Sequence, residues 1–279
     1  MEKLKVGITG ASGFIGKHLT MELSKRGNIN YVVFEGDLLK KSDLESFFKD
    51  NPNLNSIIHL AGIFSNSLEE LLKINVQATS NLLEEMLKNK VNKIVFSSTG
   101  AVYGEPIANE SIETDPRKPN TLYGVSKMYA EDIIFYYTNN FGIKHIILRF
   151  PNVYGLGNTK GVIYNFIRGI KEDKKITIYG DGSQSRNFLH VSDAVGSIIK
   201  AANYRESGIF NIADKSLYSL NDIVSILKTA NIQFTVDYRD EDAANILKVL
   251  SENITRAGDR LDWHPKARVP DELLRILIS

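Results

Sequence analysis

The sequence predicts an α/β fold, in which helices cover both faces of a doubly wound parallel sheet. Short apolar runs alternate with longer amphipathic segments, the pattern of strands followed by crossover helices. The later runs are apolar almost throughout, which is typical of strands buried on both faces. A glycine-rich stretch separates the first run from the first amphipathic segment, and 279 residues are enough to bury a sizeable core.

The first 150 residues carry the regular part of this pattern. Strands are expected where a short apolar run is bounded by turn-forming residues, and helices where apolar residues recur with helical spacing. The expected strands are 3–9, 31–35, 56–61, 93–98 and 144–150. The expected helices are 14–26, 42–51, 67–90 and 122–140.

The rhythm loosens after residue 150. The elements expected there are helices at 161–172, 192–202 and 220–230 and strands at 176–179 and 208–212. No low-complexity linker separates the two halves. Residues 151–279 are therefore expected to form a small α/β substrate-binding lobe packed on the domain of residues 1–150, with some chain returning to that domain.

Composition excludes several classes of function. The 34 Lys and Arg residues balance 33 Asp and Glu residues, so nothing indicates a nucleic-acid partner or an anionic membrane surface. Without cysteine there is no disulfide, thiolate metal site or cysteine nucleophile. The sequence also lacks a His and carboxylate cluster at metal-ligand spacing and an apolar run of about 18 residues. We expect a cytoplasmic protein without a metal.

Gly10, Gly13 and Gly16 stand where the first strand passes into the first helix. Small residues permit a tight turn there, and the free N–H groups of a helix N-terminus can face a pyrophosphate. The spacing differs from the commonest dinucleotide fingerprint, and a turn that only needs small residues is the alternative. The strand before and the helix after favour a Rossmann-type dinucleotide site.

Such a loop needs an acidic residue about 20 positions further on, where a carboxylate can bind the adenosine ribose hydroxyls. Glu35 and Asp37 both lie in the right place. A carboxylate there repels a 2′-phosphate and favours NAD as the cofactor. The nearby Lys40 and Lys41 weaken that argument, so NADP stays open.

Tyr123 and Lys127 are four residues apart at the start of an expected helix and so share one face. A Tyr hydroxyl has an ordinary pKa near 10, and a nearby ammonium lowers that pKa and makes Tyr a usable proton shuttle. Alone, the pair is a common helical pattern. It gains weight because the hydroxyl cluster Ser97, Ser98 and Thr99 ends an expected strand, where open α/β sheets bind ligands.

With further motifs, these residues resemble the extended short-chain dehydrogenases/reductases, in the nucleotide-sugar epimerase/dehydratase group. The resemblance runs almost from end to end and covers proteins similar to UDP-glucose 4-epimerase and to nucleoside-diphosphate 4-keto-sugar reductases. Besides residues 10–16, the motifs are His59-Leu-Ala-Gly62, Asn75-Val76, Ser97-Ser-Thr-Gly-Ala-Val-Tyr-Gly104, Tyr123-Gly-Val-Ser-Lys127, Arg149-Phe-Pro-Asn-Val-Tyr-Gly155, Ile178-Tyr-Gly-Asp-Gly-Ser183, Arg186-Asn-Phe-Leu-His-Val191, Phe210-Asn-Ile212 and Leu261-Asp-Trp263.

The resemblance implies a catalytic group of Thr99, Tyr123 and Lys127. Tyr123 would be the acid or base, Lys127 would bind the nicotinamide ribose and lower the Tyr pKa, and Thr99 would hydrogen-bond the reacting sugar oxygen. Asn75 matches a helix residue near the active site, with plain packing as the alternative. The implied cofactor-binding residues are Gly10, Ser12, Gly13, Phe14, Ile15, Gly16, Glu35, Asp37, Leu38, Leu60, Ala61, Gly62, Asn75, Ser97, Tyr123, Lys127 and Phe150.

The implied partner is a nucleoside-diphosphate sugar. Asn152 and Arg186 match residues that hold the diphosphate, and a guanidinium can bind it in bidentate fashion. Tyr179 matches an aromatic position near the nucleobase, where stacking and core packing are equally good interpretations. Thr99 completes the expected substrate-binding residues.

The helix that starts at Tyr123 is apolar on more than one face. A helix of that kind is buried on all sides or shared with a partner. Members of the family that this chain resembles often dimerise through this helix and the one before it. We therefore expect a homodimer.

Three departures from the family pattern bear on the reaction. Gly100-Ala101 stands where 4,6-dehydratases carry an Asp-Glu pair, which argues against dehydration. The stretch between Gly27 and His59 is short, which resembles the 4-keto-sugar reductases more than the epimerases. A reductase must release its oxidised cofactor in every turnover, and fewer contacts around the cofactor make that release faster. Asn187 replaces the usual Asp after the arginine, which puts the identity of the sugar in doubt.

The sequence leaves three hypotheses. The favoured one is a 4-keto reductase, in which NAD(P)H gives hydride to C4 of the sugar and Tyr123 protonates the oxygen. The alternative is an NAD-dependent 4-epimerase, in which hydride leaves C4 and returns to the other face. The third is a non-catalytic dinucleotide-binding sensor, against which the presence of Tyr123, Lys127 and Thr99 counts.

Overall fold

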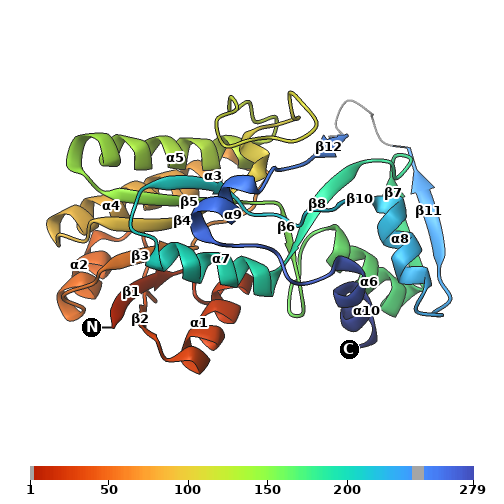
Figure 1. Ribbon diagram of the computed structural model, residues 1–279, viewed down its shortest axis with the longest axis horizontal. Helices are drawn as coiled ribbons and strands as arrows, with labels where there is room; N and C mark the ends of the chain where they lie inside the picture. Colours follow the sequence, from red (N-terminus) through yellow and green to blue (C-terminus); the bar gives the residue numbers. More distant parts are fainter. Residues whose placement is uncertain (1–2, 241–247) are drawn as a thin grey trace.

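The computed structural model describes residues 3–240 and 248–279, and six strands form its central sheet (Figure 1). Every neighbouring pair in this sheet is parallel. The expected α/β fold with a parallel sheet is confirmed. Its strands, in spatial order, are β2 (Ile29–Val33), β1 (Leu4–Thr9), β3 (Ser56–His59), β4 (Lys93–Thr99), β5 (Lys144–Phe150) and β9 (Gly208–Asn211).

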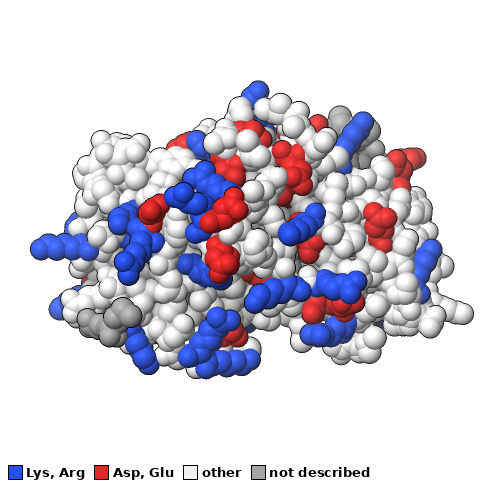
Figure 2. Space-filling view, in the orientation of Figure 1, with Lys and Arg blue, Asp and Glu red and all other residues white. Residues whose placement is uncertain are grey.

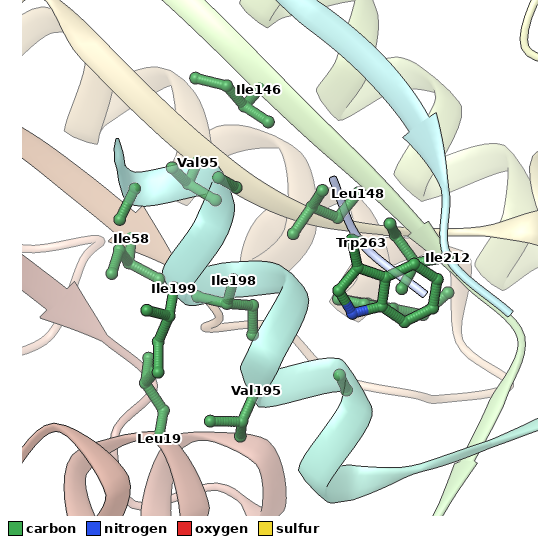
Figure 3. Close-up of a cluster of buried hydrophobic side chains, with 14 of the residues drawn as sticks. Leu19, Ile58, Val95, Ile146, Leu148, Val195, Ile198, Ile199, Ile212 and Trp263 are labelled. Atoms are coloured by element: carbon green, nitrogen blue, oxygen red, sulfur yellow. The ribbon is translucent and has the colours of Figure 1, made fainter. Parts of the chain in front are cut away.

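One face of the sheet is covered by α1 (Phe14–Arg26), α7 (Val191–Asn203) and α9 (Thr255–Leu261). Side chains from alternate strand positions enter this layer, because successive residues of a strand point to opposite faces. Figure 3 shows how Ile198 of α7 lies among strand residues such as Val95, with Trp263 at one end of the cluster.

The opposite face is covered by α2 (Lys41–Asp50), α4 (Ala78–Lys88) and α5 (Leu122–Phe141). The neighbours in sequence of the first set, such as Ile94 and Phe96 beside Val95, pack into this second core. The strands are therefore buried on both faces, which explains why their sequences are apolar almost throughout.

The expected helix at 67–90 is one helical run of three parts. It consists of α3 (Leu68–Leu71), a π-helical stretch (Leu72–Gln77) and α4. The π stretch contains the buried Asn75, and π-helical turns are frequent at functional sites. The helix expected at 14–26 has those bounds in the structure.

The second half contains more elements than the sequence predicted, because its strands are short and partly polar. The smaller sheets combine β8 (Ser185–His190) with β6 (Asn152–Tyr154), β10 (Leu217–Ser219) and β12 (Val249–Leu250), and β7 (Lys175–Tyr179) with β11 (Thr235–Arg239). The helices α6 (Val162–Asp173), α8 (Leu220–Lys228) and α10 (Val269–Ile278) enclose a third core with them. The unpredicted elements are β6, β8, β10, β11, β12, α9 and α10.

Part of the second half belongs to the large sheet. β9 pairs with β5, and α7 packs beside α1. The division of the chain near residue 150 stays a prediction. No helix among the described residues is long and apolar enough to cross a membrane.

A buried ion pair ties α5 to the sheet. Both carboxylate oxygens of Glu131 accept hydrogen bonds from Arg149 of β5, at 3.0 and 2.6 Å. Ser98 of β4 donates to the same carboxylate at 2.5 Å. Arg149 also donates to the Tyr103 hydroxyl at 2.7 Å. Glu131 and Arg149 are almost fully buried, so neither charge has water as an alternative partner.

Replacing Arg149 with Ala should lower the free energy of unfolding by about 3–5 kcal/mol, because Glu131 would remain buried without its main partner. Arg117 touches the same carboxylate at 3.3 Å from a partly exposed position, and Arg117→Ala should cost roughly 1 kcal/mol or less. Urea unfolding followed by circular dichroism measures both. Equal losses for the two variants would show that burial does not set the strength of this interaction.

Candidate functional site

A cavity of about 570 Å³ runs along the carboxyl ends of the large sheet. It lies where the strand order reverses between β1 and β3, the position at which open α/β sheets bind ligands. The second half of the chain closes it from the opposite side. The predicted site residues that line it are Gly10, Gly13, Phe14, Ile15, Gly16, Leu60, Gly62, Ser97, Thr99, Tyr123, Lys127, Phe150, Asn152 and Arg186.

The glycine loop packs too closely for side chains. Gly10 has a φ of +71°, and a Cβ built on it would lie 2.5 Å from the Ala61 nitrogen of the next strand's loop. A Cβ on Gly16 would collide with the Gly10 carbonyl oxygen. Gly13 precedes the first residue of α1, and no side chain caps that helix or adds an acid to its first turn. The free N–H groups and the positive end of the helix dipole therefore face the cavity, a good site for a pyrophosphate.

The two candidate ribose-binding acids differ in their surroundings. Asp37 is part of a turn, since its carboxylate accepts from the Leu39 N–H and its own N–H donates to Asp43, both at 2.9 Å. Glu35 is exposed, and among the described residues its carboxylate has no hydrogen-bond or ion-pair partner. Leu38 is buried in the core. None of these three lines the cavity.

Three other predicted residues also lie outside the cavity wall. Ser12 and Tyr179 are exposed, the latter at the end of β7. Ala61 contacts Gly10 behind the loop. Their predicted roles in binding remain predictions.

Asn75 is buried and does not line the cavity. Its side chain accepts from the Ile63 N–H at 2.8 Å and donates to the Ile63 carbonyl and to Ser126, both at 3.0 Å. It thus fixes the segment after β3 against α5. The geometry fits the packing interpretation of Asn75, with a positioning role for Gly62 and Ile63 in the wall.

Thr99, Tyr123 and Lys127 meet in the cavity although they come from separate elements. Thr99 ends β4, and its hydroxyl accepts from the Ala101 N–H at 3.2 Å. Tyr123 and Lys127 lie in the first turns of α5, whose start Thr121 caps by accepting from the Gly124 N–H at 3.0 Å. The helical spacing of four residues aims both side chains at the same space.

Burial governs the protonation of this group. Burial raises the pKa of Tyr123 to about 12 and lowers the pKa of Lys127 to about 8, the latter against the opposing charge of Glu131. The Lys127 ammonium lies 4.4 Å from the centroid of the Phe96 ring. The role of Lys127 in lowering the Tyr123 pKa stays a prediction, and loss of hydration of the phenolate acts in the opposite direction.

Several wall residues had no signal in the sequence. Phe64 packs its ring 5.2 Å from that of Tyr123. Lys160, Leu250 and Glu252 come from segments without a recognisable motif. The fold alone brings them to the cavity, so only the arrangement of the second half could have revealed them.

Asn187 and Arg186 lie side by side on β8 and both line the cavity. Burial lowers the pKa of Arg186, against the charges of Glu252 and Glu105. Across the described residues, no group of three or more His, Cys, Asp or Glu side chains could hold a metal ion.

Comparisons with known sequences point to one family. The sequence model of the NAD dependent epimerase/dehydratase family matches residues 6–213. The UDP-glucose 4-epimerase of Streptococcus mutans is 27% identical, over 98% of this chain and 94% of its own. The UDP-N-acetyl-alpha-D-glucosaminuronate decarboxylase of Bacillus cytotoxicus is 31% identical over 77% of each chain.

A solved structure shares the whole fold. The UDP-glucuronic acid 4-epimerase of Bacillus cereus, in complex with UDP-glucuronic acid and NAD, superimposes with a TM-score of 0.89. It is 26% identical, and the match covers 99% of each chain.

Two glycines of the loop should respond differently to alanine. Gly16→Ala should destabilise the fold, because the new Cβ collides with backbone, whereas the nearest atom to a Cβ on Gly13 is 3.2 Å away. Gly13→Ala should keep its free energy of unfolding to within about 1 kcal/mol. It should weaken dinucleotide binding, since the new methyl group enters the cavity. Thermal unfolding and calorimetric titration with NAD separate the two effects. Full affinity in Gly13→Ala would place the pyrophosphate elsewhere.

Proposed function

The chain belongs to the NAD-dependent epimerase/dehydratase family, and from this premise we propose that it is a UDP-sugar 4-epimerase that uses NAD. The observation that carries the proposal is the convergence of the glycine loop, Thr99, Tyr123 and Lys127 on one cavity. The comparisons support the epimerase alternative better than the 4-keto reductase favoured from the sequence, because the compared proteins are 4-epimerases and a decarboxylase of UDP-sugars.

The residues of the glycine loop fit NAD. Gly10 and Gly16 leave a cradle that side chains would fill, and the uncapped start of α1 would bind the pyrophosphate. Glu35 is the better candidate for the adenosine ribose, because the Asp37 carboxylate is already engaged in its turn. A carboxylate at this place favours NAD over NADP.

Bound NAD would supply the hydride acceptor at C4 and, in its oxidised form, a positive charge. Tyr123 would take the proton of the C4 hydroxyl and later return it. With a pKa of about 12, Tyr123 is almost wholly protonated at neutral pH, so positive charge nearby must lower this pKa before the phenolate can take the proton. Lys127 is the cation that this chain provides in the same space, and Thr99 would orient the C4 oxygen by a hydrogen bond.

The diphosphate of the substrate would bind between the two halves of the chain. Asn152 and Arg186 line the cavity there, and the unpredicted Lys160 adds a second cation. A guanidinium and an ammonium neutralise the charge of the diphosphate. Tyr179, which is 50% exposed, lies outside the wall and would have to approach the nucleobase from the side of the lobe.

The homodimer also stays a proposal. Ile134 and Tyr137 of α5 pack into the core, whereas Tyr129 and Tyr136 on the same helix are 44% and 57% exposed. In Figure 2, the upper left of the visible face, over the C-terminal half of α5, carries few charged side chains. An uncharged, partly aromatic surface of this kind supports association through α5.

The purified protein should retain close to one NAD per chain and interconvert UDP-glucose and UDP-galactose without added cofactor. A hydride that returns to its own substrate requires a cofactor that stays bound through the whole cycle. Denaturation followed by mass spectrometry of the released nucleotide, with a UDP-sugar isomerisation assay, measures both. An empty protein that oxidises NAD(P)H with a 4-keto sugar nucleotide would establish the reductase instead.

Tyr123→Phe should reduce kcat by about 10²–10⁴-fold, the usual contribution of a positioned acid or base. The variant should still bind NAD, since the phenyl ring preserves the packing against Phe64. Tyr136→Phe is the matched control, a tyrosine of the same helix that is largely exposed. Steady-state kinetics should show wild-type turnover for the control, and wild-type turnover in Tyr123→Phe would remove Tyr123 from the proton transfer.

A further inference from the structure

One acid lies in the wall of the cavity and has no part in the proposed reaction. Glu252 follows β12 and is 4% exposed. Among the described residues that line the cavity it is the only acid, whereas Lys127, Lys160 and Arg186 are cations. A single carboxylate in a cavity built for an anionic substrate needs an explanation.

The Glu252 carboxylate lies beside Gly100, the residue that follows Thr99. A Cβ built on Gly100 would collide with Glu252 Oε1, so the missing side chain at position 100 is what makes room for the carboxylate. Gly100 follows Thr99 and precedes Ala101, and both neighbours line the cavity.

The position of Glu252 is fixed from several sides. Its N–H donates to Asn187 Oδ1 at 2.8 Å. The Asn187 amide nitrogen donates to the carbonyls of Asp214 and Ser216, both at 3.0 Å. An aspartate at position 187 could not donate these bonds and would bring a second carboxylate close to Glu252. Asn187 therefore anchors the backbone of Glu252 without bringing a second carboxylate close to it.

Glu252 Oε2 has no hydrogen-bond partner among the described residues. A buried acceptor without a donor is costly, so the protein alone leaves this carboxylate incompletely satisfied. Burial also raises the pKa of Glu252 to about 7, with Arg186 acting in the opposite direction. A bound donor would stabilise the ionised carboxylate.

We propose that Glu252 is a specificity-determining residue, which accepts a hydrogen bond from a hydroxyl or amine of the sugar and excludes uronic acids. The inference rests on the proposed function, in which Tyr123 and Thr99 hold C4. C6 is attached to C5, the ring neighbour of C4, and this proposal places it near the carboxylate beside Gly100. A hydroxyl there donates to the ionised Glu252 carboxylate, whereas a uronate places a second negative charge against it, and like charges brought together cost several kcal/mol unless Glu252 first takes up a proton. The substrate class is thus a UDP-hexose with a neutral or amino substituent.

Calorimetric titration of the NAD-loaded full chain with UDP-glucose and with UDP-glucuronic acid at about pH 9, where the Glu252 carboxyl with its pKa of about 7 is ionised, tests this directly. The wild type should bind UDP-glucose at least about tenfold more tightly. In Glu252→Gln this preference should fall about tenfold or more, because an amide also donates and carries no charge. Glu110→Gln is the matched control: it removes a nearby exposed carboxylate, which accepts from Asn253 at 2.9 Å and does not line the cavity, and should keep the preference.

A second variant tests the same carboxylate by changing its neighbour Gly100. Gly100→Ala should displace the Glu252 side chain and reduce the preference in the same direction as Glu252→Gln. Thermal unfolding of each variant confirms that it is folded. A Glu252 with a purely structural role would lower stability and leave the ratio of the two Kd values unchanged.

The outcomes separate the two proposals. Equal binding of both sugars by the wild type, or an unchanged ratio in Glu252→Gln, overturns the role of Glu252. A protein that prefers UDP-glucose but fails to isomerise it overturns the epimerase and keeps the specificity residue. Binding of neither nucleotide sugar overturns both.

Discussion

The site depends on the buried ion pair between Glu131 and Arg149. Glu131 lies one helical turn beyond Lys127 on α5, and its carboxylate is shared by Arg149 of β5 and Ser98 of β4. Because Ser98 immediately precedes Thr99, one carboxylate fixes both sides of the catalytic group. Both charges are buried away from water, so removal of either one would leave the other without a partner and disturb this geometry.

The close approach of β1 and β3 sets the floor of the cavity. Gly10 lies against the backbone of Ala61, and Gly16 lies against the carbonyl of Gly10. This packing brings the start of α1, with its free N–H groups, to the point where the strand order reverses. The glycines therefore act through the space they leave, and the helix N-terminus supplies the electrostatic attraction for a pyrophosphate.

The second half of the chain supplies the opposite wall of the site. β8 presents Arg186 and Asn187 to the cavity, and the strand pairing of β12 with β8 brings Leu250 and Glu252 to the same wall. Asn187 links the two, because it fixes the backbone of Glu252. The first half thus contributes the glycine loop, Thr99, Tyr123 and Lys127, and in our proposal the polar wall from the second half selects the sugar.

The sequence by itself determined the parallel sheet, the glycine loop and the association of Thr99, Tyr123 and Lys127, because each depends on local spacing or on a motif. Tertiary structure decided the rest. Asn75 is a buried residue that links Ile63 to Ser126. The Asp37 carboxylate is part of a turn, whereas Glu35 is exposed. Tertiary structure also raised the pKa of Tyr123 through burial and placed Glu252 against Gly100. Burial and contacts between distant segments set these properties, and no local pattern encodes which segments will meet.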